Sequence, residues 1–381
     1  MSQHRQSPFT VILAVVVGLA AGLSLSFFEV LGSGTPAAAN FAVASIAVNA
    51  SKPAAAATGA AAPAGAGAGA GGALVTEYPH IKAVTAALDC QNTLLPARNM
   101  SDALLYMEGR IPLVLDPASK GIMAWITGNE GERAVHDVFT RLFSEGCAPA
   151  GAAAGGKAPG LFLDVGANAG FYSLIAAAYG CQVLAFDPQK VCSDLVRRNF
   201  CLNPGLPGVA GRRVAVVNAP VSDVATTLNL SVPAACEGVF FVPWKNDTPP
   251  RVPVAETYQR ASVSLDGLLL KETSAEVFVL KIDTEGYELP VMKSISGLLA
   301  TRRVRHILVE VTPVFWTRDG VPRADIYAAF LPLLGYGCRI QRVLDIAANS
   351  TALLDTAEKL REYLVVRDYI QEDVLVTCPP A

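Results

Sequence analysis

The sequence predicts an α/β fold built on a mostly parallel β-sheet, and two features of the chain support that prediction. From residue 161 onward, apolar runs alternate with helical or loop segments, as strands alternate with crossover helices in such a sheet. Polar side chains stand near the end of every run, where the ligands of parallel sheets bind. The runs are LFLDVG (161–166), QVLAFDP (182–188), RVAVVNAPV (213–221), VFVLKID (277–283) and HILVEVT (306–312), with Asp164, Asp187, Asn218, Asp283 and Glu310 near their ends.

Two further apolar segments lie near the carboxyl terminus of the chain. They are YGCRIQRV (336–343) and EDVLVTCP (372–379), and both have the length and composition of strands. We expect them to form an antiparallel pair at one edge, which brings the predicted sheet to seven strands.

The amino-terminal segment predicts a membrane anchor. Residues 8–28 carry no charged side chain, and they match the roughly 20 apolar residues that a helix needs to cross a bilayer. Arg5 precedes this run and Glu29 follows it, so residues 1–7 are expected in the cytosol and the rest across the membrane. A cleaved signal peptide, with a cut site at 35–40, and an organellar transit peptide are the alternatives.

A stalk and a helical extension are expected between the anchor and the sheet. Residues 29–73 are dominated by Ala, Gly and Pro, which predicts a flexible, disordered spacer. Residues 74–160 are predicted to be a mostly helical extension of the main domain, which spans 161–381. His136 lies outside the apolar stripe of this extension and is expected at an edge or in solvent, with a ligand or base role as the alternative. The stripe consists of Val135, Val138, Phe139, Leu142 and Phe143.

Composition favours the secretory pathway and argues against nucleic acid. The formal net charge is −3, so no basic field attracts a polyanion. The eight cysteines form no C-x-x-C pair, which disfavours zinc; one or two disulfides are expected, with buried apolar thiols as the alternative. We therefore expect a glycosylated, single-pass type II protein of the endoplasmic reticulum or Golgi, the alternatives being secretion or a chloroplast location. N-x-[ST] acceptors occur at Asn49, Asn99, Asn229, Asn246 and Asn349.

The glycine loop FLDVGANAGFYS (162–173) differs from the loops that hold phosphate. A dinucleotide loop has the spacing G-x-G-x-x-G, but Asn168 and Phe171 occupy the second and third glycine positions. A nicotinamide-dependent sugar oxidoreductase is therefore a weak alternative. Asp187 ends the second run, where a carboxylate can accept both hydroxyls of a ribose.

The pattern Asp164-x-Gly166-x-Asn168-x-Gly170 resembles the first motif of Rossmann-like S-adenosylmethionine-dependent methyltransferases. More broadly, residues 105–379 resemble the FkbM family, which mostly methylates hydroxyl oxygens of sugars and other natural products. This resemblance implies a Rossmann-like methyltransferase fold with helices on both faces of the sheet, and S-adenosyl-L-methionine as cofactor. It rests on FLDVGANAGFYS, AFDP, RRNFCLN, VVNAPVSD, VSLDGLL, VLKIDTEGYELPVMKS and ILVEVTP, which occur in that order.

The resemblance also implies a set of cofactor-binding residues. The first motif would hold the methionine end, Asp187 the ribose, and Ser222 with Asp223 the adenine. Asp187 stands where a glutamate is frequent in the family, and the stretch 228–259 is atypical and is expected to cover the acceptor site. The cofactor-binding set is Asp164, Gly166, Ala167, Asn168, Gly170, Asp187, Ser222 and Asp223.

Carboxylates gather after the fourth run, in LKIDTEGYE (280–288). Strand alternation places Lys281 and Asp283 on one face, and Glu285 and Glu288 follow in the turn. We predict that these four residues are catalytic and that Asp283 and Glu285 orient and deprotonate an acceptor hydroxyl, because crowded like charges raise the pKa of one carboxylate toward that of a useful base.

Two other readings of this carboxylate segment stay open. Lys281 and Asp283 could form a purely structural ion pair. No metal is predicted, but Mg²⁺ or Ca²⁺ held by Asp283, Glu285 and Glu310 is an alternative. His306 begins the fifth run and is expected to be structural.

The sequence thus predicts a membrane-anchored, lumen-facing methyltransferase that O-methylates a hydroxyl of a glycan or related small molecule. A methyltransferase fold kept as a noncatalytic binding or scaffold domain is the alternative from another class of protein.

Overall fold

The computed structural model describes residues 79–85, 88–90, 103–147, 159–236, 253–271, 276–366 and 371–380. The predicted cytosolic tail (1–7), membrane helix (8–28) and stalk (29–73) lie outside the described residues, so these remain predictions. In the part of the chain that is described, no helix has the length and apolar character needed to span a bilayer.

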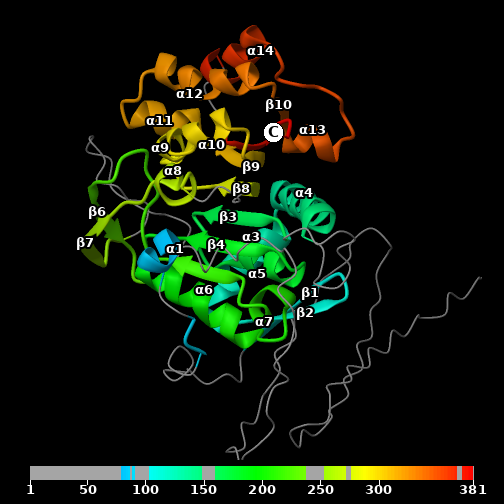
Figure 1. The fold of residues 1–381 in the computed structure, drawn as a ribbon, viewed down its shortest axis with the longest axis vertical. Coiled ribbons are helices and arrows are strands. Elements are labelled where there is room, and N and C mark those ends of the chain that lie inside the picture. Colours follow the sequence, from blue (N-terminus) through cyan, green and yellow to red (C-terminus); the bar gives the residue numbers. More distant parts are fainter. Residues whose placement is uncertain are drawn as a thin grey trace, which may run out of the picture. The chain divides into compact units, whose positions relative to one another are not determined.

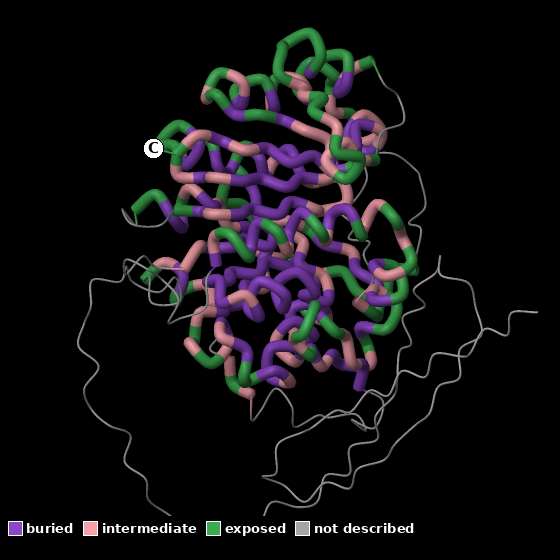
Figure 2. The backbone as a smooth tube through the Cα atoms, turned by 90° about the vertical axis from the view of Figure 1, so that its right-hand side faces the viewer, coloured by how far each residue is buried: buried purple, intermediate pink, exposed green. Residues whose placement is uncertain are grey.

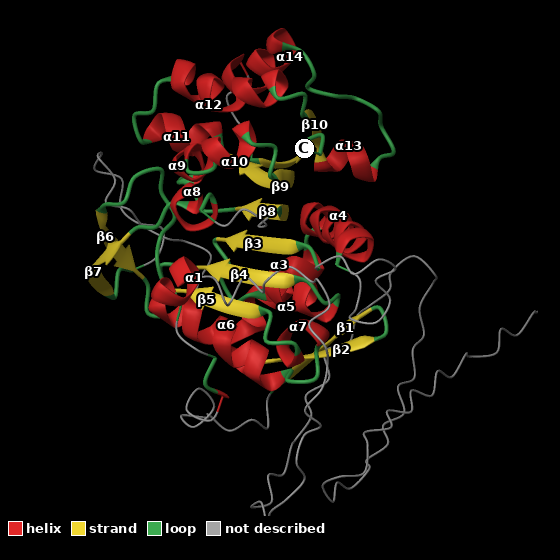
Figure 3. Ribbon diagram, viewed as in Figure 1, coloured by secondary structure: helices red, strands yellow, loops and turns green. Residues whose placement is uncertain are grey.

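A seven-stranded sheet forms the centre of the fold, in the order β10-β11-β9-β8-β3-β4-β5 (Figure 1; Figure 3). The strands β3, β4, β5, β8 and β9 pair in parallel, whereas β11 is antiparallel to both β9 and β10. All seven predicted strands and the antiparallel edge pair are confirmed. The bounds are β3 (Leu161–Val165), β4 (Gln182–Phe186), β5 (Val214–Val217), β8 (Val277–Ile282), β9 (Val304–Val311), β10 (Arg339–Arg342) and β11 (Glu372–Thr377).

Each face of the sheet has its own hydrophobic core. Leu161, Leu163 and Val165 of β3 pack with one set of helices, and Phe162 packs with the other, as strand alternation requires. Figure 2 shows the strands buried between layers whose outer segments are exposed. One core includes α8 (Leu265–Leu269), α9 (Glu288–Lys293), α10 (Ser296–Ala300), α11 (Pro313–Arg318), α12 (Arg323–Gly335) and α14 (Ala357–Arg361). The other includes α3 (Lys120–Gly128), α4 (Glu130–Gly146), α5 (Phe171–Ala178), α6 (Lys190–Leu202) and α13 (Val343–Ala347).

The segment before the sheet is less helical than its composition suggests. It contains α1 (Pro79–Val84), but also an antiparallel hairpin of β1 (Leu104–Glu108) and β2 (Ile111–Leu115), followed by the short helix η3 (Pro117–Ser119). The prediction of a mostly helical extension is therefore wrong for this hairpin. Gly109 makes the turn with a positive φ of 57°, which glycine adopts without strain.

The amphipathic helix of the extension is confirmed as α4. The side chain of Asn129 caps its first turn by accepting from the amides of Gly131 and Glu132. All five residues of the predicted apolar stripe are buried. His136 is partly buried beside them, where its Nε2 lies 2.7 Å from Glu108 Oε2, so it has a structural partner.

The atypical stretch at 228–259 forms part of a separate two-stranded sheet. Its strands are β6 (Thr227–Val232) and β7 (Glu256–Ala261), and residues 237–252 between them lie outside the described part. The hydroxyl of Tyr258 donates to the carbonyl of Pro188 at 2.9 Å. The described part of this stretch therefore packs against the turn after β4. Two short helices, α7 (Pro207–Ala210) and η4 (Glu362–Val366), complete the described elements.

All eight cysteines form disulfides, twice as many bonds as the larger number expected. Several cysteines lie in apolar segments, where the sequence does not distinguish a buried thiol from a half-cystine. Each bond is expected to stabilise the fold by about 2–4 kcal/mol, and such bonds persist in oxidising compartments. The pairs are Cys90–Cys201, Cys147–Cys181, Cys192–Cys236 and Cys338–Cys378.

Candidate active site

A cavity of about 610 Å³ lies at the carboxyl ends of β3, β4, β5 and β8. It extends to α3, α4 and the start of β11, and it has the size of a small-molecule site. Of the residues predicted from sequence, the cavity brings together Gly166, Ala167, Asn168, Asp187, Lys281, Asp283 and Glu285.

Gly166 holds the end of β3 against the end of β8. Its φ is +80°, and a Cβ at this position would stand 1.7 Å from the carbonyl oxygen of Asp283. Even alanine would therefore force the two strand ends apart. Gly170 has a different role, because a Cβ there would meet Val196 of α6 at 2.9 Å and because the residue does not line the cavity.

Asp187 joins the end of β4 to the glycine loop. Its two carboxylate oxygens accept from the amides of Asn168 and Gln189, each at 2.9 Å. Burial raises the pKa of Asp187 to about 7, although both backbone hydrogen bonds oppose the rise. Beside it, Oε1 of Gln189 is buried and has no hydrogen-bond partner among the described residues. This end of the cavity, called the cofactor end below, thus offers hydrogen-bond acceptors to a ligand.

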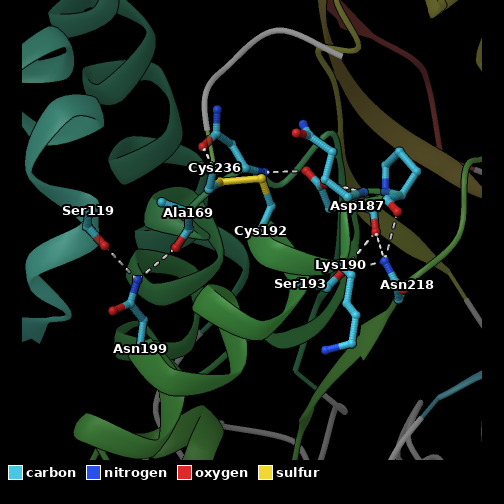
Figure 4. Close-up of a disulfide and its surroundings, with 12 residues drawn as sticks. Ser119, Ala169, Asp187, Lys190, Cys192, Ser193, Asn199, Asn218 and Cys236 are labelled. Carbon is cyan, nitrogen blue, oxygen red and sulfur yellow. Dashed lines mark hydrogen bonds between the residues drawn. A yellow bond between two sulfur atoms is a disulfide. The ribbon is translucent and has the colours of Figure 1, made fainter. Parts of the chain in front are cut away.

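A disulfide and an amide fix the rim of the cofactor end (Figure 4). Cys192 in the first turn of α6 is bonded to Cys236, whose Sγ lies 3.2 Å from Oδ1 of Asn168. On the other side, Nδ2 of Asn218 donates to the carbonyls of Asp187 and Pro188 at 2.9 and 3.0 Å. The turn after β4 is therefore held from two directions.

Asp164 lies beneath the cavity and does not line it. Its Oδ2 accepts from Ser173 at 2.6 Å, and its Oδ1 lies 3.7 Å from Nζ of Lys281. Burial raises the pKa of Asp164, and Lys281 opposes that rise. Asp164 therefore supports Lys281 and does not face a ligand.

Lys281 connects the glycine loop to the carboxylate segment. Its Nζ lies 3.0 Å from Oδ2 of Asp283 and donates to the carbonyl of Gly166 at 3.1 Å. Burial disfavours the charged ammonium, but Asp283 and Asp164 outweigh it and raise the pKa of Lys281. The ion pair considered from the sequence is present, yet the side chain of Asp283 remains 41% exposed and lines the cavity.

Glu288 is buried away from the cavity, contrary to the position expected for a catalytic carboxylate. Its Oε1 accepts from the amides of Thr284 and Gly286, each at 2.9 Å, and its Oε2 accepts from Nε1 of Trp316 at 2.7 Å. It holds the turn that follows β8.

Ser222 and Asp223 do not reach the cavity either. Ser222 lies 3.2 Å from the hydroxyl of Tyr287, which does line the cavity. The three residues that precede Ser222, namely Ala219, Pro220 and Val221, also line it.

The other end of the cavity lies toward β9 and β11, away from β4 and Asp187. Most of the residues that line this end were not predicted from the sequence. We call it the acceptor end: Trp125, Glu132, Asp283, Glu310, Gln371 and Asp373. Trp125, Glu132, Gln371 and Asp373 lie outside the motifs quoted above. The one local signal was an acidic pair, Glu372 and Asp373, at the start of an apolar strand.

None of the described residues that line the cavity is a histidine. Nδ1 of His306 lies 3.1 Å from Oγ1 of Thr377, which joins β9 to β11. Within the described ranges, no three His, Cys, Asp or Glu side chains are grouped closely enough to hold a metal ion. The metal alternative at Asp283, Glu285 and Glu310 therefore gains no support.

The chain matches a known family of protein domains over part of its length. Residues 164–339 match the Methyltransferase FkbM domain. The matched segment runs from β3 to the first residue of β10, so it excludes α3, α4 and β11. A search of curated proteins finds no relative of the chain.

The chain is also similar to solved structures at low identity. A methyltransferase FkbM from Methylobacillus flagellatus KT is 12% identical with a TM-score of 0.33, and the alignment covers 57% of this chain and 43% of that chain. A SAM-dependent methyltransferase from Geobacter sulfurreducens, in complex with S-adenosyl-L-homocysteine, is 13% identical with a TM-score of 0.30, covering 64% and 90%. A SAM-dependent methyltransferase from Agrobacterium tumefaciens is 8% identical with a TM-score of 0.29, covering 75% and 73%. The chain spans less than half of the length of the first structure.

Proposed function

The chain contains an FkbM methyltransferase domain at residues 164–339, and on that premise we propose that it transfers a methyl group from S-adenosylmethionine to a hydroxyl of a glycan or related small molecule. S-adenosylmethionine is the cofactor of this family, so the family match confirms the cofactor predicted from the sequence. One observation carries the proposal: a cavity at the carboxyl ends of the parallel strands is lined by both the glycine loop and Asp187.

The residues at the cofactor end suit the nucleoside part of this cofactor. Asp187 and the unpartnered Oε1 of Gln189 accept hydrogen bonds, and ribose hydroxyls donate them. Ala219, Pro220 and Val221 provide an apolar wall for a base.

The carboxylate segment suits proton removal from an acceptor. When bound, the cofactor supplies a methyl group on positively charged sulfur; transfer forms a carbon–oxygen bond, leaves the carbon–sulfur electron pair on sulfur and releases the hydroxyl proton. Asp283 is the group that would take that proton, because it lines the cavity at the end of β8 and is oriented by Lys281. Glu285 lines the cavity two residues later and would orient the hydroxyl.

Calorimetry on the purified full-length chain tests the cofactor assignment. We expect S-adenosylmethionine and S-adenosylhomocysteine to bind and NAD not to bind. Binding of NAD alone would favour the oxidoreductase alternative. Cofactor binding without transfer to any hydroxyl acceptor would favour the scaffold alternative.

Cofactor affinity should depend on the ionisation of Asp187. Its pKa is raised to about 7, so lowering the pH from about 8 to about 6 protonates the carboxylate that accepts from the ribose. We expect affinity to fall, by up to about tenfold per pH unit below 7. The probe is 5′-methylthioadenosine, which keeps the ribose but has no amino-acid group that titrates near neutral pH. An affinity that is constant over this range would contradict the assignment.

The raised pKa of Asp187 also predicts that its contribution to stability increases as the pH falls, opposite to the trend in cofactor affinity. The folded state holds the Asp187 proton more tightly than the unfolded chain, whose pKa is about 3.9. The contribution of Asp187 to stability is therefore greatest below about pH 4 and is lost as the pH rises through about 7.

We propose a type II orientation with the domain in the lumen of the endoplasmic reticulum or Golgi. Four disulfides support an oxidising compartment, and the two glycosylation acceptors within the described residues, Asn229 and Asn349, are both exposed. Glycosidase treatment of protein from cells is expected to lower its apparent mass, and Asn229→Gln with Asn349→Gln should remove part of that shift. Protease added outside intact microsomes should spare the domain. An unglycosylated protein in chloroplasts or mitochondria would contradict this orientation.

A further inference from the structure

We propose that the acceptor end is a sugar-binding subsite in which the indole of Trp125 stacks on a pyranose ring and the neighbouring carboxyl groups bind its hydroxyls. This inference rests on the proposed methyl transfer and adds the residues that select the acceptor.

The position of this subsite points to a role in specificity. The cofactor end and Asp283 belong to the segment that matches the family, whereas Trp125 on α3, Glu132 on α4 and Asp373 on β11 lie outside residues 164–339. The segment that matches the family thus provides Asp283 and the cofactor end, and segments outside the match help to close the other end of the cavity.

Trp125 is an exposed aromatic side chain that is nevertheless held in place. It is 60% exposed while lining the cavity, and its Nε1 lies 3.3 Å from Oε1 of Glu132. The other oxygen of Glu132 accepts from the hydroxyl of Tyr172 at 3.2 Å. A positioned indole presents a flat apolar face, which matches the carbon–hydrogen face of a sugar ring.

The carboxyl groups beside Trp125 have hydrogen-bonding capacity left over. Oε1 of Glu310 accepts from Nε2 of Gln371 at 2.9 Å, but its Oε2 is buried without a partner among the described residues. Asp373 lies opposite Glu310 in the pairing of β11 with β9. A buried polar atom without a partner is costly unless a ligand forms a hydrogen bond with it, and a sugar hydroxyl can do so either as donor or as acceptor.

Charge also favours a neutral acceptor over an amine. Burial, followed by the nearby charge of Asp283, raises the pKa of Asp373 to about 8 and that of Glu310 well above its usual range. At neutral pH Asp373 therefore holds a proton that it can donate to a sugar oxygen. The methyl donor brings a positive charge to the same cavity, which repels a cationic acceptor.

The test measures methyl transfer by the full-length chain to the methyl glycosides of glucose, galactose, mannose, xylose, arabinose and fucose, with spermidine as the cationic probe. We expect transfer to at least one glycoside and none to spermidine. Trp125→Ala should raise the KM for that glycoside roughly tenfold or more with kcat changed by less than about threefold, since it removes ground-state binding. Trp125→Phe should restore most of the affinity, and Glu132→Gln should raise KM with unchanged affinity for S-adenosylhomocysteine.

The matched control is Leu344→Ala on α13, which truncates an apolar side chain that is 46% exposed and does not line the cavity. Three results would each overturn the subsite. The first is a KM for Trp125→Ala equal to that of the control, and the second is a loss of S-adenosylhomocysteine affinity in Trp125→Ala as large as its rise in KM. The third is methyl transfer to spermidine and to no glycoside. Transfer to none of the six glycosides by a protein that binds S-adenosylhomocysteine would also overturn it. Failure of that binding would count against the proposed function instead.

Discussion

Asp283→Asn is expected to lower the turnover number about a hundredfold or more, the usual loss when a general base is removed. The asparagine keeps the shape of the side chain but cannot accept a proton from the acceptor hydroxyl. The Lys281 side chain is only 6% exposed but that of Asp283 is 41% exposed, so loss of the pairing should cost less than the roughly 3–5 kcal/mol of a fully buried pair. Lys281 keeps the carbonyl of Gly166 and the carboxylate of Asp164 as partners. The measurements are steady-state kinetics, thermal unfolding and affinity for S-adenosylhomocysteine.

The alternative hypothesis, that Asp283 and Lys281 form a purely structural ion pair, predicts a large loss of stability for the same variant. If Asp283 served only to neutralise Lys281, its removal would reduce the free energy of unfolding by about 3–5 kcal/mol, and activity would fall in step with the folded fraction. Glu285→Gln is the companion variant, because Glu285 lines the cavity two residues farther along the same turn. A loss of turnover in Asp283→Asn with unchanged stability would establish the catalytic assignment.

Glu288→Ala is expected to lower the free energy of unfolding by about 3 kcal/mol or more. The substitution leaves the amides of Thr284 and Gly286 and the indole Nε1 of Trp316 without their acceptor, and each unsatisfied buried donor costs about 1–3 kcal/mol. Denaturant unfolding measures the loss. The control is Glu358→Ala, an exposed glutamate on α14 whose removal should change stability by about 0.5 kcal/mol or less.

Activity distinguishes Glu288 from Asp283. Under conditions where Glu288→Ala is still folded, we expect it to retain more turnover than Asp283→Asn, since Glu288 does not line the cavity. If Glu288→Ala were stable but inactive, the prediction that Glu288 is catalytic would be supported.

The five parallel strands could be predicted from sequence because they are buried on both faces and therefore read as nearly continuous apolar runs. The hairpin at 104–115 could not, since Tyr106, Glu108 and Arg110 break the apolar pattern and the strands are stabilised by contacts with distant helices. Asn199 of α6 and Asn203, the residue that caps its carboxyl end, illustrate this. Their Oδ1 atoms accept from the amides of Asp116 and Val114, which lie more than eighty residues away in the sequence.

The residues of the candidate site also differ in how far they could be predicted from the sequence. Gly166, Asp187 and Asp283 stand at strand ends, where a local pattern locates them. Asp164 and Glu288 belong to the same motifs, but a carboxylate that holds the backbone and one that faces a ligand look alike in sequence. Trp125 and Asp373 reach the cavity only through tertiary packing. The acidic pair at the start of β11 is the one local signal for Asp373, and no local pattern marks Trp125.

The contact between Gly166 and Asp283 limits how this sequence can change over generations. A Cβ at position 166 would displace the carbonyl of Asp283, so a substitution in the loop of the methyl donor also disturbs the proposed base. The two positions cannot drift independently. A substitution at Gly166 would therefore be expected to impair both binding of the methyl donor and catalysis. A related protein that binds the donor without catalysing transfer is expected to have changed at position 283 or 285 instead.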